Sequence, residues 1–503
     1  MDGSGTLVSV ASLRAALDEE LGAAPRLLPP NAVAPALLSR RDKVAEWAHA
    51  QVSRPFIPSE QEIIAVSKAR HGVRPVAIWD LPSRLLYRAL TSRLDSTLTL
   101  PPRSSKAWYG FQWQPLDLPG EYIVAADIAS CYELIDHGLL AEELLVQTDD
   151  HAAVDALMGL LKEASGRTYG LPQQSVASDV LAEVFLDKLE RALVRRGLIV
   201  GRYNDDFRLN CDSWSDVVRS IETLSEEARR LGLILNDSKT FTWSRVKYQA
   251  HLQKVEDLRR EIAEEAELDL AAFDADEYDG GEGAIELDQD AVEQLTAARI
   301  LERWSRVAGR GKLAVARRSE HQALMQLLPV AFTALSATEN EPDGTLDTAM
   351  RLLRYEQTTT PHVSRYLMSR SNDSAVLSAF DKLLRRNAYL TGWQTWWLQQ
   401  PLSRLASFNS GRTGQRRVQW VRDAFTSAQR SPVLRAQAAM TLARLGLIDT
   451  DELVRVYDRS SPVVRPVIVS AIGFLKPAQA IRRAVTGASQ LDQWAFDWAV
   501  QNA

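Results

Sequence analysis

Two consecutive acidic residues at the tip of an expected β-hairpin are the first sign of chemistry in this sequence. Asp205 and Asp206 end the run Y-N-D-D at residues 203–206, which lies between an apolar stretch and the alternating residues 207–209. Asn and Asp favour tight turns, so the pattern predicts a strand, a turn and a returning strand. Adjacent carboxylates repel each other, and hard oxygen ligands of this kind suit Mg²⁺. For this pair on its own, a solvated turn without a metal is the alternative.

A third carboxylate closes an apolar strand upstream. Residues 122–128 (Y-I-V-A-A-D-I) predict a buried strand that ends at Asp127. A carboxylate in that place belongs at a sheet edge or at the mouth of a site rather than in a core. With Asp205 and Asp206 it would complete a two-metal centre, in which ions ~3.5–4 Å apart hold the attacking and leaving oxygens of a phosphoryl transfer.

The elements that would position these acids are strands set between helices. The strand patterns lie at residues 73–79, 122–126 and 197–203, and the helix patterns lie at residues 174–194 and 213–231. The mixture predicts an α+β region over residues 61–250. Residues 1–60 predict an N-terminal helical segment, because Leu13, Leu17 and Leu21 fall on one helix face.

The remainder of the chain differs in composition from this region. Residues 261–290 carry thirteen acidic and no basic side chains, and with their glycines they predict an acidic linker or loop over residues 251–290. Residues 291–503 hold 28 basic and 17 acidic residues, a net charge of +11. The overall charge of −6 therefore hides a basic C-terminal region.

A repeat in the basic region indicates stacked helices. The run S-P-V-L-R at residues 431–435 returns as S-P-V-V-R at residues 461–465, and a small-apolar helix pattern follows each copy. The two copies resemble HEAT-type repeats and predict an all-α helical repeat domain over residues 291–503. A helical bundle with a coincidental match is the alternative.

Composition sets further bounds. With 503 residues, 46% hydrophobic and 25% charged, the chain is long enough for two or three folded domains. Two cysteines cannot form a disulfide framework, and no apolar run approaches the ~20 residues of a membrane span. The chain is therefore expected in the cytoplasm, without a membrane partner.

Three further motifs accompany the acids. A basic hairpin pattern occupies residues 68–76, G-L-P-Q occupies residues 170–173, and G-L-I-L-N-D-S-K-T occupies residues 232–240. With D-I-A-S-C-Y-E-L-I at residues 127–135 and with Y-N-D-D, the series resembles the fingers and palm of reverse transcriptases in the order of its members. The resemblance covers about 180 residues and implies an α+β fingers and palm fold over residues 61–250.

The resemblance implies roles for individual acids and for one aromatic ring. Asp127 and Asp205 resemble the principal Mg²⁺ ligands and Asp206 the weaker third carboxylate, with Mn²⁺ as the alternative ion. Such ions lower the pKa of a primer 3′-hydroxyl and neutralise charge on the triphosphate. Tyr132 resembles the aromatic gate that lies under the sugar and excludes a 2′-hydroxyl. Without its neighbours, Tyr132 would be interpreted as a core aromatic.

The remaining predicted site residues bind the incoming nucleotide in the family. Gln173 resembles the residue beside the sugar, and Arg74 and Lys68 resemble the cations that hold the triphosphate, with Arg70 as an alternative to Lys68. Lys239 resembles the late palm lysine that protonates the departing pyrophosphate, and a surface lysine is the alternative.

The sequence also departs from the family pattern at three positions. Gln174 stands where a glycine is usual, Asp179 where a proline is usual, and Glu183 where an asparagine is usual. A side chain at position 174 would intrude where backbone passes close to nucleic acid. These departures bear on template and primer handling more than on metal chemistry.

A palm followed directly by a helical repeat region resembles the bacterial abortive-infection and unknown-group reverse transcriptases, which act in antiphage defence. The resemblance implies dNTP substrates, RNA or single-stranded DNA, in some members a non-coding RNA, and homo-oligomers. It also implies, for some members, synthesis primed by a protein hydroxyl, for which residue type alone suggests Tyr355, Tyr366, Tyr389 and Tyr457.

Two other functions stay open on the sequence. One is an RNA-binding sensor or scaffold with secondary catalysis, in which three paired arginines at residues 385–386, 416–417 and 482–483 contact phosphates and Trp393, Trp396 and Trp397 stack on bases. Solvated arginines and core tryptophans are the simpler interpretation of these residues. The other function is a retron-type or mobile-element reverse transcriptase that copies a defined RNA.

Overall fold

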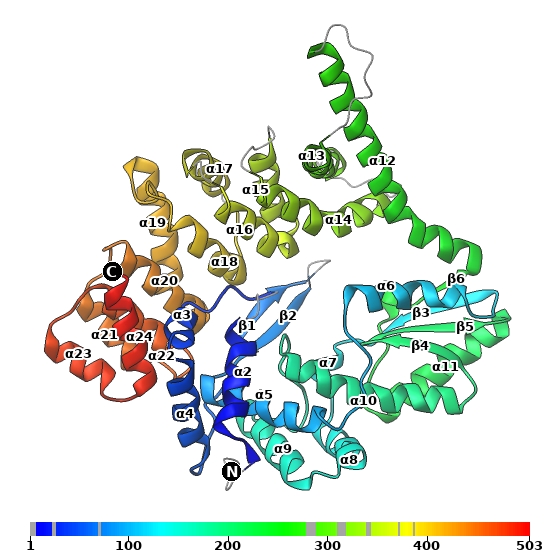
Figure 1. Ribbon diagram of the computed structural model, residues 1–503, viewed down its shortest axis with the longest axis horizontal. Helices are drawn as coiled ribbons and strands as arrows, with labels where there is room; N and C mark the ends of the chain where they lie inside the picture. Colours follow the sequence, from blue (N-terminus) through cyan, green and yellow to red (C-terminus); the bar gives the residue numbers. More distant parts are fainter. Residues whose placement is uncertain are drawn as a thin grey trace.

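The computed structural model describes residues 7–22, 27–68, 72–277, 288–308, 318–338, 344–370, 373–385 and 388–503. Arg70 and Arg386 lie outside these ranges. Figure 1 shows the chain passing from the N-terminal helices through a sheet, along the helix α12, and back through the C-terminal helices to its starting point. The last helix α24 (Gln490–Gln501) contacts α3 (Ala34–Leu38), and the rings of Trp47 and Trp494 meet edge to face, so the two ends of the chain pack together.

A four-stranded antiparallel sheet, in the order β4-β5-β3-β6, carries the predicted acids. Its strands are β3 (Tyr122–Asp127), β4 (Ile199–Tyr203), β5 (Asp206–Cys211) and β6 (Phe241–Ser244). The strand patterns at residues 122–126 and 197–203 and the hairpin at Y-N-D-D are therefore confirmed. The register pairs Asp127 with Asp206 across β3 and β5.

Each face of this sheet is covered by a different set of helices. Helices α10 (Val176–Arg195) and α11 (Trp214–Arg230) pack against the strands, in agreement with the helix patterns of the sequence. Alternate residues of the central strands, such as Val124 and Phe207, are buried in the core on that side. On the face that bears the acids, α6 (Ser105–Trp113) packs against β4.

A second, two-stranded sheet lies beside the first. Strands β1 (Glu62–Ser67) and β2 (Val73–Ile78) form an antiparallel hairpin, as the basic hairpin pattern predicts. Helices α2 (Val10–Gly22) and α4 (Arg41–Val52) pack on each other and on α5 (Leu81–Asp95), so the N-terminal segment shares a core with the four-stranded sheet. Helices α8 (His137–Thr148) and α9 (His151–Ser165) complete this half of the molecule.

The prediction of an acidic linker or loop over residues 251–290 is wrong for most of that segment. Helix α12 runs from Arg245 to Glu277, and α13 begins at Gln289; residues 278–287 lie outside the described ranges. Glu, Ala and Leu are strong helix formers. The buried residues Leu258, Ile262 and Ala266 recur at every fourth position of α12, and α12 packs on α13. The acidic side chains that lie between these three positions in the sequence face solvent or pair with Arg303.

The rest of the described chain consists of helices in two rows. They are α13 (Gln289–Ala308), α14 (Arg318–Ser336), α15 (Thr345–Tyr355), α16 (Thr360–Met368), α17 (Asp373–Arg385), α18 (Gly392–Leu402), α19 (Gly411–Thr426), α20 (Pro432–Arg444), α21 (Thr450–Tyr457), α22 (Arg465–Phe474), α23 (Gln479–Thr486) and α24. The even-numbered helices contact one another in succession from α14 to α24. Helices α13, α15, α19, α21 and α23 each pack on the even-numbered helix that follows. We call residues 289–503 the helical domain.

The two copies of the sequence repeat begin neighbouring helices of the even row. Ser431 caps α20, where its hydroxyl accepts from the backbone N–H of Leu434, and residues 461–465 lead into α22. Helices α20 and α22 contact each other directly. The thirty-residue spacing of the repeat is therefore the spacing of successive helices in this row.

The tryptophans of α18 join the helical domain to the N-terminal segment. Trp393 and Trp397 are buried, and the indole N–H of Trp397 donates to the carbonyl oxygen of Leu27 at 2.8 Å, as does that of Trp393 at 2.5 Å. The interpretation of these residues as core aromatics is confirmed. Base stacking by Trp393 and Trp397 is excluded, because their rings have no free face.

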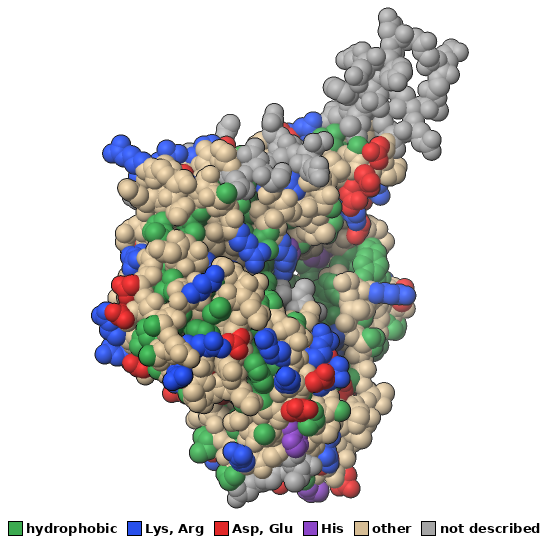
Figure 2. All heavy atoms as spheres, turned by 60° about the vertical axis from the view of Figure 1, so that its left-hand side comes forward, with side chains coloured by type: hydrophobic (Ala, Val, Ile, Leu, Met, Phe, Trp, Pro, Cys, Tyr) green, Lys and Arg blue, Asp and Glu red, His purple; other side chains and the backbone are tan. Residues whose placement is uncertain are grey.

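Two members of the arginine pairs of the helical domain are engaged by acids of the same domain. Arg417 is buried in an ion pair with Asp381 at 2.7 Å, and Arg482 pairs with Asp497 at 3.0 Å. Figure 2 shows Lys and Arg side chains spread over one face of the molecule, with acidic side chains among them.

In the described part of the chain, none of the helices is long and apolar enough to cross a bilayer.

Candidate active site

Three carboxylates meet where β3 and the β4–β5 turn end. Asp127, Asp205 and Asp206 each place an oxygen within 4.8 Å of an oxygen of the other two. The backbone N–H of Ile128 donates to the carbonyl oxygen of Asp205 at 3.1 Å, which ties the end of β3 to the turn. The sheet register thus converts two separate sequence motifs into one cluster.

The cluster is electrostatically unfavourable without a cation. Burial raises the pKa of Asp205, and the nearby Asp127 raises it further. Burial also raises the pKa of Asp206 to about 6; Arg208, with its guanidinium 3.9 Å away, opposes that rise. Three acidic oxygens that repel one another in a partly buried place are a donor set that fits a divalent metal ion.

Lys239 and Asn236 bind the acid at the end of β3. The ammonium of Lys239 lies 2.7 Å from Oδ1 of Asp127, and the amide of Asn236 donates to Oδ2 at 2.9 Å. Asn236 also donates its backbone N–H to the Asp127 carbonyl oxygen at 2.8 Å. Lys239 is a surface lysine, with a side chain that is 45% exposed, and its charge faces the carboxylate cluster.

Two residues of the site adopt backbone conformations that L-residues disfavour. Asn204 in the Y-N-D-D turn has φ 54°, and Ser130 before α7 (Cys131–Leu134) has φ 50°. Asn tolerates the left-handed region better than most residues, which accounts for its place in the turn. Both conformations turn the chain sharply beside an acid, Asp205 in one case and Asp127 in the other.

The G-L-P-Q loop is held against α7 by its backbone. The N–H of Leu171 donates to the carbonyl oxygen of Tyr132 at 2.7 Å, and the amide of Gln173 donates to Oε1 of Glu133 at 3.1 Å. Gln174 has φ 67°. The chain therefore keeps the left-handed backbone that a glycine would adopt at this position, with a side chain added.

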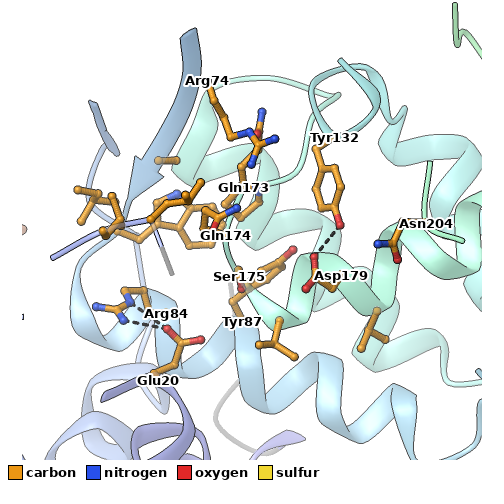
Figure 3. A pocket seen from close by; sticks show the side chains of 18 of the residues that line it. Glu20, Arg74, Arg84, Tyr87, Tyr132, Gln173, Gln174, Ser175, Asp179 and Asn204 are labelled. Carbon is orange, nitrogen blue, oxygen red and sulfur yellow. Dashed lines mark hydrogen bonds and ion pairs between the residues drawn. The ribbon is translucent and has the colours of Figure 1, made fainter. Parts of the chain in front are cut away.

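A cavity of about 1670 Å³ opens in front of the acids. All eight predicted site residues line it, namely Lys68, Arg74, Asp127, Tyr132, Gln173, Asp205, Asp206 and Lys239. Figure 3 shows Arg74, Gln173 and Tyr132 around the cavity, with the Tyr132 hydroxyl directed at Asp179. The cavity exceeds the ~300–1,000 Å³ of ordinary small-molecule pockets, so it has room for more than one nucleotide.

The helical domain forms the far wall of this cavity. Trp396 of α18, Gln437 of α20 and Val467 of α22 line it together with residues 27–32 of the N-terminal connector. Helices α18 and α20 also contact β1. The acids and the helical domain therefore line one cavity, an arrangement that the sequence motifs did not indicate.

Sequence reasoning missed four polar residues around the site. Arg103, Arg202 and Glu183 form buried or half-buried ion pairs behind Tyr132, and Asn236 binds Asp127. Asn236 belongs to the motif that contains Lys239, so the motif was a usable signal. No local pattern marks Arg103, whose partners lie about 30 to 80 residues away.

Comparison with known proteins agrees on the central region. Residues 66–256 match the family model described as reverse transcriptase (RNA-dependent DNA polymerase). A putative COX1/OXI3 intron 2 protein of Saccharomyces cerevisiae is 31% identical over 80 residues, which are 14% of this chain and 9% of that protein. The chain thus spans under a tenth of the length of this relative.

Solved structures of telomerases align loosely with the chain. Telomerase from Candida albicans, in complex with a TWJ fragment of telomeric RNA, is 11% identical with a TM-score of 0.29, over 73% of this chain and 64% of that one. Apo telomerase from Candida tropicalis is 10% identical with a TM-score of 0.29, over 71% and 72% of the two chains. The family match instead coincides with the sheet and the loops that surround the three acids. Residues 66–256 of this chain form a reverse transcriptase domain.

Proposed function

We propose that this chain is an RNA-directed DNA polymerase, a nucleotidyltransferase that adds dNTPs by two-metal phosphoryl transfer. The observation that carries the proposal is the cavity in which Asp127, Asp205 and Asp206 face Lys68 and Arg74. Acids on one side and cations on the other suit a substrate that carries both a metal-bound end and a triphosphate.

The three aspartates would hold the metal. Mg²⁺ is the ion expected from their oxygen ligands, with Mn²⁺ as the alternative. When bound, such ions would supply neutralisation of phosphate charge and a lowered pKa at the primer hydroxyl. The ammonium of Lys239 forms an ion pair with Asp127. During the reaction it would move from this carboxylate to the departing pyrophosphate and donate its Nζ proton there.

The other predicted residues bind and orient the nucleotide. Arg74 and Lys68 bind phosphate oxygens, Arg74 through two parallel N–H donors. The side chain of Gln173, held by Glu133, lies beside the sugar. The ring of Tyr132 lies below the sugar, where it excludes a 2′-hydroxyl.

A direct test is incorporation of labelled dNTP by the full chain with Mg²⁺. Replacing Asp205 and Asp206 together with Ala should abolish incorporation while the protein stays folded by circular dichroism. The matched control replaces two exposed acids, Asp451 in α21 and Asp458 directly after it, neither of which lines the cavity. Equal labelling by the two double variants would contradict the proposal, and substitution of Mn²⁺ for Mg²⁺ tests the choice of ion.

A role in antiphage defence is the biological setting that we propose. It is supported by a long helical domain, of HEAT-like type in this proposal, that directly follows the reverse transcriptase domain. Bacteria that express the chain should resist at least one phage of a diverse panel, and the D205A variant should not. Protection by D205A equal to that of the unsubstituted chain would contradict a role for DNA synthesis in defence.

Priming from a protein hydroxyl is the corresponding proposal for initiation, within a homo-oligomer that binds RNA or single-stranded DNA. Tyr355 and Tyr389 are 51% and 75% exposed, whereas Tyr366 is fully buried and is not a reachable nucleophile. A DNA adduct that survives denaturation and disappears after protease treatment is expected. Its loss in Y355F or Y389F would identify the nucleophile, and its absence during active synthesis would exclude protein priming.

Copying of a defined RNA is the second candidate, and the match to an intron-encoded yeast protein favours it. Sequencing of nucleic acid that co-purifies with the chain separates the two candidates. A discrete cDNA of one RNA, including a non-coding RNA partner, supports copying, and random or homopolymeric DNA supports defence. The scaffold alternative loses two of its three proposed stacking residues, because Trp393 and Trp397 are buried.

A further inference from the structure

A chain of polar contacts begins at Tyr132, below the nucleotide site. The hydroxyl of Tyr132 donates to Oδ1 of Asp179 at 2.6 Å (Figure 3). The guanidinium of Arg103 lies 3.2 Å from the same Asp179 oxygen and 3.3 Å from the Tyr132 hydroxyl. Burial and the charge of Asp179 raise the pKa of Tyr132, so its hydroxyl stays a donor at neutral pH.

The contacts continue to the turn that carries the metal-binding acids. A second nitrogen of Arg103 lies 3.1 Å from Glu183, whose other oxygen pairs with Arg202. Arg202 in turn donates to the carbonyl oxygen of Asn204 at 3.1 Å, one residue before Asp205. The side chains of Glu183 and Arg202 are each only 3% exposed, so water screens this part of the chain of contacts poorly.

Both acids of this network are departures from the reverse transcriptase pattern. Asp179 and Glu183 stand one turn apart on α10, where the family usually has proline and asparagine. Together they supply the two carboxylates that hold Arg103. The usual residues at these positions could not make these ion pairs, so the network belongs to this chain rather than to the fold.

The following inference rests on the polymerase function proposed above. We propose that Asp179 is a positioning residue that fixes the ring of Tyr132. The fixed ring sets the selectivity for deoxyribonucleotides over ribonucleotides. A tyrosine ring turns about two side-chain torsions. A short hydrogen bond to a charged oxygen, here 2.6 Å, removes that freedom at the far end of the ring. A fixed ring excludes a 2′-hydroxyl, and a ring that swings aside admits it.

The test compares binding of dCTP and CTP to the full chain by calorimetry, with Ca²⁺ present so that no chemistry follows. The same ratio is then measured from single-nucleotide incorporation with Mg²⁺. Tyr132→Phe keeps the ring and removes its anchor, whereas Asp179→Ala removes the acceptor. Tyr87→Phe is the matched control, since the Tyr87 hydroxyl bonds Ser178 on the same helix at 2.8 Å without touching Tyr132.

We expect Y132F and D179A each to lower the dCTP preference at least fivefold, while dCTP binding itself weakens less. The double variant should lose no more preference than either single variant, because each substitution already removes the Tyr132–Asp179 hydrogen bond that fixes the ring. D179N, which keeps a neutral acceptor, should fall between D179A and the unsubstituted chain. Y87F should keep the full preference. Thermal melts of all variants confirm that they are folded.

The outcomes separate this inference from the function on which it rests. A dCTP preference that persists in Y132F and D179A overturns the role of Asp179 and leaves the polymerase function intact. Additive losses in the double variant overturn it as well, because the two residues would then act independently. If the unsubstituted chain binds neither nucleotide, the proposed function itself fails, and the inference fails with it.

Discussion

The carboxylate cluster of the reverse transcriptase domain and the Asp381–Arg417 pair of the helical domain treat buried charge in opposite ways. Around the four-stranded sheet, three like charges gather within 4.8 Å, and the pKa values of Asp205 and Asp206 are raised as a result of burial and mutual repulsion. In the helical domain, the buried Asp381 meets Arg417 directly at 2.7 Å. The repulsion among the three carboxylates remains for a ligand to relieve, whereas the charge of Asp381 is neutralised by Arg417 within the protein.

The two regions differ in backbone strain as well. In the described part of the chain, Ser130, Gln174 and Asn204 have left-handed φ angles and line the cavity. Lys476 is the only non-glycine residue of the described helical domain with such an angle, and it does not line the cavity. Strain and unrelieved charge that occur together mark a region shaped for binding, whereas regular helices with paired charges mark one shaped for packing.

The largest expected effect is a difference in dNTP incorporation between substitutions of a single acid in each of the two regions. Asp127→Asn removes a proposed metal ligand and should lower dNTP incorporation by about 10²–10³-fold or more. Asp381→Asn in the helical domain should leave the rate per folded molecule unchanged. Both are measured with labelled dNTP after correction for folded protein. An equal loss of activity in D381N would remove the functional distinction between the regions.

Protein stability should show the opposite pattern, because substitution of the acid in the helical domain should destabilise the protein. Asp381→Ala leaves Arg417 buried without its partner and should lower the free energy of unfolding by about 3–5 kcal/mol. Replacing both residues with Leu should recover most of that loss, since no unpaired charge remains. Urea denaturation followed by circular dichroism measures both. A decrease of less than 1 kcal/mol in the free energy of unfolding of D381A would show that Asp381 does not neutralise a buried Arg417 charge.

Removing an acid from the cluster should instead stabilise the metal-free protein. Because the pKa of Asp206 is raised from 3.8 to about 6, the folded state binds more protons than the unfolded state between those values. Its contribution to the free energy of unfolding therefore falls as pH rises from about 4 to 6 and stays low above.

Asp206→Asn should accordingly stabilise the metal-free chain by about 1–2 kcal/mol at pH 7.5, with allowance for a side chain that is 31% exposed, and by less at pH 4.5. Thermal melts at the two pH values in EDTA measure this. Added Mg²⁺ should raise the Tm of the unsubstituted chain at pH 7.5 more than that of D206N. Equal Mg²⁺ effects would contradict metal binding by Asp206.

The smallest effect concerns the strained backbone. Gln174→Gly and Lys476→Gly both relieve a left-handed conformation, with φ 67° and 48°, and each should stabilise by roughly 0.5–1 kcal/mol. Only Gln174→Gly should also change nucleotide incorporation, since Lys476 lies outside the cavity. Denaturation and labelled dNTP assays on the same preparations decide this, and a change in activity for K476G would contradict the assignment of strain to function.

Local patterns were sufficient to predict three of the strands and the positions of the acids, whereas the other residues of the site were predicted from the resemblance to reverse transcriptases. Apolar runs and turn residues placed Asp127 at a strand end and Asp205 in a hairpin turn, because periodicity and turn chemistry act over a few residues. The same reasoning misjudged α12, where the density of acids concealed the regular spacing of Leu258, Ile262 and Ala266. Weighing the period above the composition would have predicted the helix.

The order of the motifs, through its resemblance to reverse transcriptases, predicted that a carboxylate cluster, the G-L-P-Q loop and a basic hairpin belong to one site. The tertiary structure alone decided what surrounds that site. Trp393 meets Leu27 across 366 positions, and Tyr132 meets Asp179 across 47. Contacts of that separation leave no local pattern, because burial and ion pairing depend on which distant segments pack together.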